Sequence, residues 1–373
     1  MLRINARLGV FVTGAVLFIL FVSKFVPAPP VNVDSVWERP QQITEEGIVP
    51  YDRANATFVT VVPSKDLWKL VKTIRDVEDR FNRAYHYDWV FMSDEEFDPE
   101  FVKLTSALTS GEASYVKIPT AEWTYPDWID QKQVFQGRQK LAGKHALPGD
   151  VGSRQHLSRY LAGHFWRQPE LDKYRYFWRI DSDIKLHCDI NYDVFKFMEE
   201  NGKKVGFAMT LFDYVDHIPT LWNTTKLFLE EYPHYKNGDS LINFISDDGE
   251  RYNRCKFWTN FQIGDLDFWR SKAYRDYFDY LDREGGFYYE MWGDGPVHTI
   301  AASLFLSKDE VHYFEDIGYY HTPFNSCPLD EQVRLKQRCS CDPVKHFAHK
   351  DFSCLPRYYR SKNLDKDGNQ LME

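Results

Sequence analysis

The chain has 373 residues, of which 43% are hydrophobic and 17% aromatic, so it can form one large α/β domain or two smaller ones. This composition excludes disorder for the bulk of the chain. The formal net charge of −9 lacks the positive excess of a nucleic-acid binder, and we expect no nucleic-acid partner.

The N-terminal segment predicts a membrane anchor. Residues 8–23 carry no charged side chain, and Arg3 and Arg7 precede them. At about 1.5 Å per residue this run spans roughly 24 Å, which suits a thin early-secretory bilayer. The alternative is a cleaved signal peptide, but the proline-rich residues 27–30 leave no clean cleavage site. The two arginines predict a cytosolic N-terminus and a lumenal remainder.

The pattern along the chain predicts five parts. A proline-bearing, polar and aperiodic stretch follows the anchor and is typical of a stem. The expected parts are a cytosolic tail (1–7), a signal-anchor helix (8–25), a stem (26–53), a single lumenal domain (54–360) and a polar tail (361–373).

Cysteine usage agrees with an oxidising compartment. Six cysteines can form up to three disulfides: Cys188, Cys255, Cys327, Cys339, Cys341 and Cys354. A zinc site that joins the last four to His346 and His349 is the alternative, but the Cys-x-Cys spacing fits no common zinc finger. Asn55 and Asn223 begin Asn-x-Thr triplets and are expected glycan acceptors if the domain is lumenal.

Strands and helices alternate at the start of the predicted domain. The nearly continuous apolar run at 56–62 predicts a buried parallel strand. Helical spacing from Leu67 to Phe81 predicts a helix with Ser64 as its N-cap. Three further elements follow: a strand at 89–92, a helix at 101–108 and a strand at 114–118. This order predicts a Rossmann-like α/β fold, but no glycine-rich loop follows the first strand, which argues against NAD and P-loop chemistry.

The centre of the chain carries the strongest chemical signal. An aromatic strand at 174–180 runs directly into Asp181-Ser182-Asp183. Two carboxylates at the C-terminal end of a buried strand can share a divalent cation, which neutralises a diphosphate leaving group. The Asp-x-Asp at 265/267 could instead cap a helix. The Asp-x-Asp at 365/367 lies in the polar tail and is expected to form a solvated turn. Because an unpaired carboxylate pair beside a buried strand is costly, we favour metal binding over capping at 181/183.

Ordered segments between residues 54 and 330 carry a family resemblance. They lie at 56–60, 77–82, 85–91, 177–179, 188–195, 252–261, 292–298 and 316–323. These segments resemble the fungal KTR/MNT α-1,2-mannosyltransferases, which are glycosyltransferase family 15. The match covers nearly the whole predicted lumenal domain.

The resemblance implies both a fold and a reaction. The implied fold is an α/β domain of the GT-A type with a mixed, mainly parallel central sheet, in a single-pass type II protein of the Golgi membrane. The implied donor is GDP-mannose and the implied cofactor Mn²⁺. The implied reaction is a retaining transfer that makes α-1,2-linked mannose on the O- or N-linked glycans of a mannosylated glycoprotein.

Matched motif positions imply the site residues. Metal ligands are implied at Asp181, Asp183 and His321, with Asp181 also close to the donor. Arg179 matches an arginine near the donor phosphates, and Asp294 matches an aspartate close to the transferred sugar. The alternative for Arg179 is a structural role, as the partner of a buried carboxylate.

Three departures from the family pattern bear on the mechanism. Gln262 stands where the family has its candidate nucleophile, a glutamate; residues 62–64 lack an arginine near the nucleotide; and Arg154 replaces a tyrosine and is expected at the donor. Because a carboxamide is a poor nucleophile, we predict front-face attack with Gln262 as a catalytic dipole. The alternatives are that Gln262 only satisfies a buried polar group, and that the protein is an impaired, lectin-like transferase or a partner subunit in a Golgi complex.

Overall fold

The structure is a computed structural model that describes residues 41–44, 47–50, 52–142 and 150–365. The predicted anchor at 8–25 lies outside these ranges. Within them, no helix is long and apolar enough to cross a membrane.

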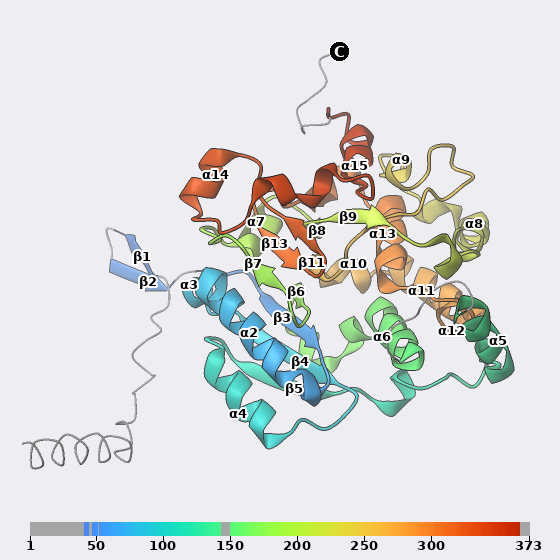
Figure 1. Ribbon diagram of the computed structural model, residues 1–373, viewed down its shortest axis with the longest axis horizontal. Coiled ribbons are helices and arrows are strands. Elements are labelled where there is room, and N and C mark those ends of the chain that lie inside the picture. The colour runs from blue at the N-terminus through green and yellow to red at the C-terminus, as the bar shows by residue number, and fades with distance from the viewer. Residues whose placement is uncertain (1–40, 45–46, 51, 143–149, 366–373) are drawn as a thin grey trace, which may run out of the picture. The chain divides into compact units, whose positions relative to one another are not determined.

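The largest sheet among the described residues has seven strands in the order β12-β8-β11-β6-β3-β4-β5 (Figure 1). Its strands are β3 (Ala56–Val61), β4 (Asp88–Ser93), β5 (Ala113–Lys117), β6 (Tyr176–Ile180), β8 (Val205–Phe207), β11 (Phe261–Asp265) and β12 (Val311–Tyr313). β11 is antiparallel to β6 and β8, and the other neighbours are parallel. The predicted mixed, mainly parallel sheet is therefore confirmed.

Smaller sheets accompany the large one. β9 (Thr210–Phe212) pairs with β10 (Cys255–Phe257), and β13 (Tyr319–His321) lies between β14 (Phe324–Ser326) and β7 (Lys185–Leu186). In the predicted stem, β1 (Gln41–Thr44) and β2 (Gly47–Pro50) pair antiparallel. The polar, aperiodic sequence of the stem did not predict these two strands.

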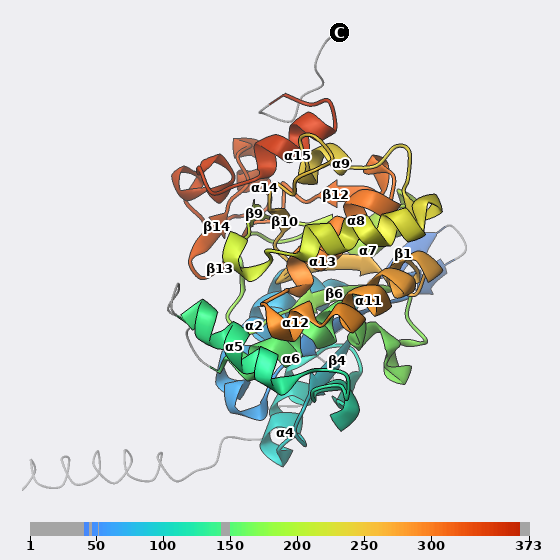
Figure 2. The ribbon, with the colours of Figure 1, turned by 90° about the vertical axis from the view of Figure 1, so that its right-hand side faces the viewer.

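The helices were predicted in part. They are α2 (Leu67–Val77), α3 (Arg83–Tyr85), α4 (Pro99–Leu108), α5 (Gln131–Ala142), α6 (Val151–Gly163), α7 (Val194–Glu200), α8 (Leu221–Glu231), α9 (Ile242–Ile245), α10 (Leu266–Trp269), α11 (Lys272–Glu284), α12 (Gly286–Tyr289), α13 (Asp294–Phe305), α14 (Glu331–Lys336) and α15 (Leu355–Ser361). Helices α5, α6, α11 and α12 face the viewer in Figure 2.

The central strands are buried on both faces, which explains their nearly continuous apolar sequences. Phe58 and Trp178 belong to one core, shared with α2, α4 and α7, whereas Val59 and Phe177 belong to the other, shared with α6, α11 and α13. Successive side chains of a strand point to opposite faces, so each strand supplies both cores. Phe58 stacks on Trp89 of the neighbouring strand with ring centroids 4.6 Å apart.

The predicted N-cap of the second element is wrong. Ser64 begins a single 3₁₀ turn that ends at Asp66, and α2 starts at Leu67 without a side-chain cap. Extended backbone at Pro63 brings the chain off β3 and places Ser64 one turn too early to cap α2. Helical spacing nevertheless continues through a π turn that carries Phe81 into the core.

All six cysteines form disulfides: Cys188–Cys339, Cys255–Cys354 and Cys327–Cys341. The predicted disulfides are confirmed. Because the sulfur atoms are bonded to each other, they are not available as thiolate ligands for the alternative zinc site. Such bonds persist in oxidising compartments.

Opening the longest covalent loop should cost the most stability. The Cys188–Cys339 pair is 151 residues apart and the Cys327–Cys341 pair only 14. Loop-closure entropy predicts losses in unfolding free energy of about 5 and about 3 kcal/mol for the respective double alanine variants. Urea denaturation of both variants measures this difference, and a larger loss for the short loop would contradict it.

Candidate active site

A cavity of about 350 Å³ opens where β3 and β4 end. Its lining includes Val62, Asp66, Asp94, Trp123 and Arg154. In open α/β sheets, ligands bind outside the carboxyl ends of the strands, and this cavity occupies that position. Arg154, which the sequence leads us to expect at the donor, lies in the wall of this cavity.

An arginine and two aspartates form an ion-pair network beside the end of β6. Arg179 donates to Asp181 from Nε at 2.8 Å and from Nη2 at 3.0 Å, and its Nη1 donates to Asp294 at 2.6 Å. Burial alone would lower the pKa of Arg179, but the two carboxylates raise it above its usual value. Arg179 therefore stays charged and holds the two aspartates together. This contact fits the alternative given above for Arg179, a structural role as the partner of a carboxylate.

Asp294 begins α13 and is fixed from two sides. Thr259 donates its hydroxyl to Asp294 Oδ2 at 2.6 Å, and Oδ2 also accepts the bond from Arg179. Burial would raise the pKa of Asp294, but Arg179, His298 and Thr259 bring it below its usual value. The carboxylate is therefore ionised, and no described residue donates a hydrogen bond to its other oxygen, Oδ1.

Gln262 lies in the same part of the sheet. It is paired with Arg179 in the register of β11 and β6, and directly opposite residues of an antiparallel pair point to one face. Its side chain is buried and reaches His298, with Gln262 Nε2 3.0 Å from His298 Nδ1. His298 follows Asp294 by one turn of α13. Sequence reasoning missed His298, although the i, i+4 spacing from Asp294 was a signal that could have found it.

Asp183 points away from the ion-pair network. Its backbone is left-handed, with φ of 68°, and its side chain is 54% exposed. It forms one described ion pair, with Lys69, whose Nζ lies 3.9 Å from Asp183 Oδ2. The three carboxylates of Asp181, Asp183 and Asp294 face two described cations, the guanidinium of Arg179 and the ammonium of Lys69. This excess of negative charge suits a divalent cation.

Strand pairing brings His321 to the loop that carries Asp183. Tyr320 of β13 pairs with Lys185 of β7, so His321 continues the register toward Ile184. His321 Nδ1 lies 3.2 Å from the carbonyl oxygen of Thr322, an arrangement in which Nδ1 donates and Nε2 keeps its lone pair for a metal. The ring packs edge-on against Trp258 at 5.2 Å.

The donor set fits a metal in chemistry, because two carboxylates and an imidazole form a mixed oxygen and nitrogen set that suits Mn²⁺. The three side chains are not gathered, and the described residues hold no group of three or more ligands already close enough to bind an ion. The structure thus places His321 at the end of β13, next to the loop that carries Asp183, and turns Asp181 back toward Arg179.

Trp292 and Asp265 have structural roles. Trp292 is buried, and its Nε1 donates to Glu290 at 2.6 Å. Asp265 caps α10 by accepting from the backbone N–H of Asp267, as its alternative predicted.

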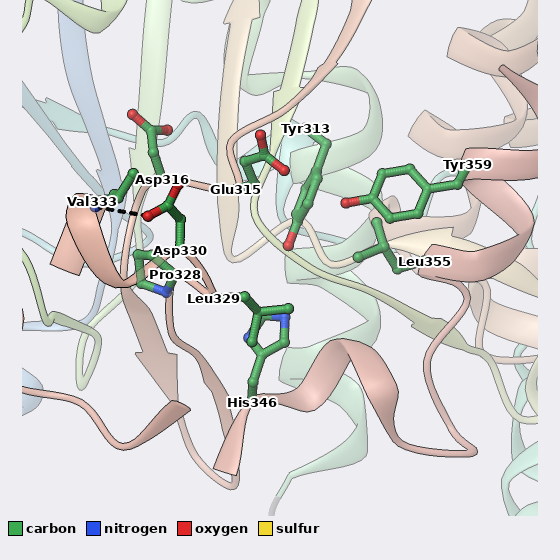
Figure 3. A pocket seen from close by; sticks show the side chains of 10 residues that line it. All are labelled: Tyr313, Glu315, Asp316, Pro328, Leu329, Asp330, Val333, His346, Leu355 and Tyr359. Carbon is green, nitrogen blue, oxygen red and sulfur yellow. Dashed lines mark hydrogen bonds between the residues drawn. The ribbon is translucent and has the colours of Figure 1, made fainter. Parts of the chain in front are cut away.

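A second cavity lies at the opposite edge of the sheet. It has a volume of about 380 Å³ and is lined by side chains that include Tyr313 of β12, Glu315, Asp316, His346 and Tyr359 (Figure 3). None of the residues expected at the metal, the donor or the transferred sugar lines it. We therefore assign the candidate site to the end of β6 and the neighbouring cavity at β3, where the ion pairs and the expected ligands lie.

Comparison with known proteins gives the family. Residues 29–363 match the family model described as glycolipid 2-alpha-mannosyltransferase. The chain is 51% identical to the alpha-1,2 mannosyltransferase KTR1 of Saccharomyces cerevisiae, over 84% of this chain and 80% of that protein. It is 48% identical to the glycolipid 2-alpha-mannosyltransferase 1 of Candida albicans, over 88% of this chain and 76% of that protein.

Solved structures agree with these relatives. The crystal structure of core-mannan synthase A (CmsA/Ktr4) from Aspergillus fumigatus in its Mn/GDP form is similar with a TM-score of 0.79 and 36% identity, over 84% of this chain and 86% of that one. The mannosyltransferase Ktr4p of S. cerevisiae in complex with GDP is similar with a TM-score of 0.80 and 34% identity, over 85% and 84%. The expected GT-A type of fold agrees with both.

Proposed function

Because the chain belongs to the glycolipid 2-alpha-mannosyltransferase family, we propose that the acidic cluster after β6 is where it transfers mannose from GDP-mannose in α-1,2 linkage. The chain is a GDP-mannose-dependent mannosyltransferase, as its relatives named alpha-1,2 mannosyltransferases and its GDP-bound structural relatives indicate. The observation that carries the assignment of the site is the network in which Arg179 holds Asp181 and Asp294 beside the cavity at β3.

A divalent metal, which we take to be Mn²⁺, would be held by Asp183, Asp181 and His321 together with the donor diphosphate. The Mn/GDP form of the A. fumigatus relative supports this choice. When bound, the ion supplies positive charge to the diphosphate as it leaves. The chain's own part is to keep Asp183 exposed on left-handed backbone and to hold Asp181 beside Arg179.

The nucleotide would occupy the cavity at the ends of β3 and β4. Arg154 gives the cavity wall a guanidinium, which binds phosphate and stacks on planar rings. Trp123 offers an aromatic surface on the same wall. These two side chains supply what the missing arginine at residues 62–64 would have supplied.

Asp294 would orient the transferred sugar. Its Oδ2 is occupied by Arg179 and Thr259, so Oδ1 is the atom that would accept a hydrogen bond from a sugar hydroxyl. An ionised acceptor held by two donors costs little reorganisation when the sugar binds. Arg179 acts through Asp294 and Asp181 and is a positioning residue in this account.

Retention would proceed by front-face attack. The acceptor hydroxyl enters on the side from which the diphosphate leaves, and the diphosphate takes its proton. This route needs no nucleophile beneath the sugar ring, only a dipole that stabilises positive charge at the anomeric carbon. The Gln262 side-chain oxygen supplies that dipole in our proposal.

Replacing Gln262 with alanine should lower kcat by about 10- to 1000-fold, the scale of one preorganised electrostatic contact. Gln262→Glu should remain active, because a carboxylate also stabilises positive charge. Mass spectrometry of the chain stopped during turnover should find no mannosyl adduct. An adduct on Asp294 or Asp265 would contradict front-face attack.

The proposed activity is tested by incubating the purified full-length chain with Mn²⁺ and GDP-mannose, with and without methyl α-mannoside. We expect GDP release that depends on the acceptor and a mannosylated product. A chain that binds mannosides without releasing GDP would instead fit the lectin-like alternative. The reason for this alternative is the glutamine at position 262, where the family has a glutamate.

We place the protein in the Golgi membrane, with its catalytic domain in the lumen and a mannosylated glycoprotein as its acceptor. The three disulfides support an oxidising compartment. An O-linked acceptor is supported by the Schizosaccharomyces pombe relative named O-glycoside alpha-1,2-mannosyltransferase omh1, which is 40% identical over 92% of this chain. The type II anchor at 8–25 remains a prediction from the sequence.

A further inference from the structure

A buried histidine lies beneath the proposed reaction centre, and the mechanism above does not use it. We propose that His298 is a positioning residue that fixes the Gln262 carboxamide with its oxygen, Oε1, directed toward the donor sugar. This inference rests on the proposed function, because the sugar is the group that the oxygen would face.

A glutamine needs such a partner to act as a dipole of defined direction. Its carboxamide presents an acceptor, Oε1, and a donor, Nε2, of nearly equal size, and rotation by half a turn exchanges them. If Nε2 faced the anomeric carbon, its positive end would oppose the charge that develops there. The rate therefore depends on which atom is turned toward the sugar.

The fold holds the two side chains together. β11 supplies Gln262 and α13 supplies His298, and both are almost fully buried, with 3% and 2% of their surfaces exposed. Trp269 and Tyr274 pack edge-on against the imidazole at 5.5 and 5.9 Å between ring centroids. Because these rings enclose it, the imidazole keeps its orientation and presents Nδ1 to the carboxamide.

The tautomer of His298 sets the orientation of the amide. His298 Nδ1 lies 3.0 Å from Gln262 Nε2 and 3.2 Å from Gln262 Oε1, so Nδ1 can bond to either atom, and the position of the ring proton decides which one it is. The backbone carbonyls of Leu161 and Ala162 interact with the imidazole and oppose the lowering of its pKa by burial, and no described acceptor lies within hydrogen-bond limits of Nε2. A proton on Nε2 leaves Nδ1 as an acceptor, which receives the N–H of Gln262 and leaves Oε1 for the sugar.

The imidazole is kept neutral by its surroundings. Burial lowers the pKa of His298 to about 4. The charge of Arg179 also lowers this pKa, whereas the charge of Asp294 raises it. A neutral ring is required, because an imidazolium donates from both nitrogens and would turn the Gln262 oxygen away from the sugar. Burial of the pair thus keeps the ring in the neutral form that the proposed orientation requires.

The test compares two substitutions of His298 in the full-length chain. His298→Phe keeps the ring but removes the acceptor, and we expect kcat to fall about 10- to 100-fold while KM for GDP-mannose stays within about twofold. His298→Asn offers a carbonyl oxygen near the position of Nδ1, and we expect it to recover most of the lost kcat. Unchanged kcat in His298→Phe would overturn the proposal.

A double-mutant cycle separates positioning from a general loss of structure. In the Gln262→Ala background His298 has no carboxamide to orient, so adding His298→Phe should change kcat by less than about twofold. An equal fold-loss in both backgrounds would show that His298 acts on the fold and not through Gln262, and would overturn the proposal.

Spectroscopy tests the orientation without any activity. The full-length chain labelled with ¹⁵N-histidine should show the His298 ring neutral at pH 7, with its proton on Nε2; the signal is assigned by its absence from His298→Asn. A proton on Nδ1, or an imidazolium, would overturn the inference. Absence of mannosyl transfer by the wild-type chain would overturn the proposed function instead. The His298 tautomer would in that case still test the orientation of the Gln262 side chain, but not its role in catalysis.

Discussion

Asp183→Asn is expected to lower mannosyl transfer by about 100-fold or more while leaving the unfolding temperature within about 2 °C of wild type. Asp183 is half-exposed, and its one described ion pair is the long contact with Lys69, so the fold does not depend on its charge. Asparagine also tolerates the left-handed backbone at φ of 68°, which alanine does not. The loss therefore reports on the metal and not on strain.

A matched control exists in the same chain. Asp267 belongs to the second Asp-x-Asp motif, its side chain is 63% exposed, and it lies beside the N-cap of α10. Asp267→Asn should keep wild-type turnover. Titration of both variants with Mn²⁺ completes the comparison: Asp183→Asn should need more metal for half-maximal rate. Full turnover in Asp183→Asn, or wild-type turnover in excess chelator, would refute the metal assignment.

Arg179→Met is expected to destabilise the domain by about 3–5 kcal/mol and to abolish transfer. The Arg179 side chain is 11% exposed, and that of Asp294 is 13% exposed. Without the guanidinium, Asp294 and Asp181 would face each other as partly buried like charges. Urea denaturation of wild type and variant at pH 7 measures the loss of unfolding free energy.

The pH dependence of this loss has a definite sign. In the folded wild type the pKa of Asp294 lies below its usual value of 3.8. The ion pair of Asp294 with Arg179 therefore stabilises the fold fully above pH 3.8, and this stabilisation is lost as the pH falls through the pKa that Asp294 has in the folded protein. The difference between wild type and Arg179→Met should therefore narrow below pH 3.8. Arg167→Met is the control, because Arg167 pairs with Asp279 at the surface and its loss should cost about 1 kcal/mol at most. Equal losses for both variants would contradict the account.

Local pattern predicted the elements that begin the domain. The strands at β3, β4 and β5 are short apolar runs between polar turns, and the core that buries them on both faces demands that composition. What local pattern could not give is how distant strands meet. The antiparallel insertion of β11 between β6 and β8 is a long-range pairing, and it alone places Gln262 opposite Arg179.

The site was predictable in its residue types and less so in its contacts. Asp181 and Asp183 are separated by one residue, and the sequence alone gives them equivalent roles. The left-handed backbone at Asp183 nevertheless sends the two carboxylates in different directions. Arg179 proved to bind the aspartates around it, a contact set by the separate packing of α13 against the sheet. The Gln262–His298 contact joins residues 36 positions apart, and neither residue alone signalled it.

The central claim is that this chain transfers mannose with retention at the cluster after β6. The most direct measurement is the NMR spectrum of the disaccharide made from GDP-mannose and methyl α-mannoside by the full-length chain with Mn²⁺. We predict an α-configured mannose joined to oxygen 2 of the acceptor. A β-configured product, or no product with donor, metal and acceptor all present, would contradict the account.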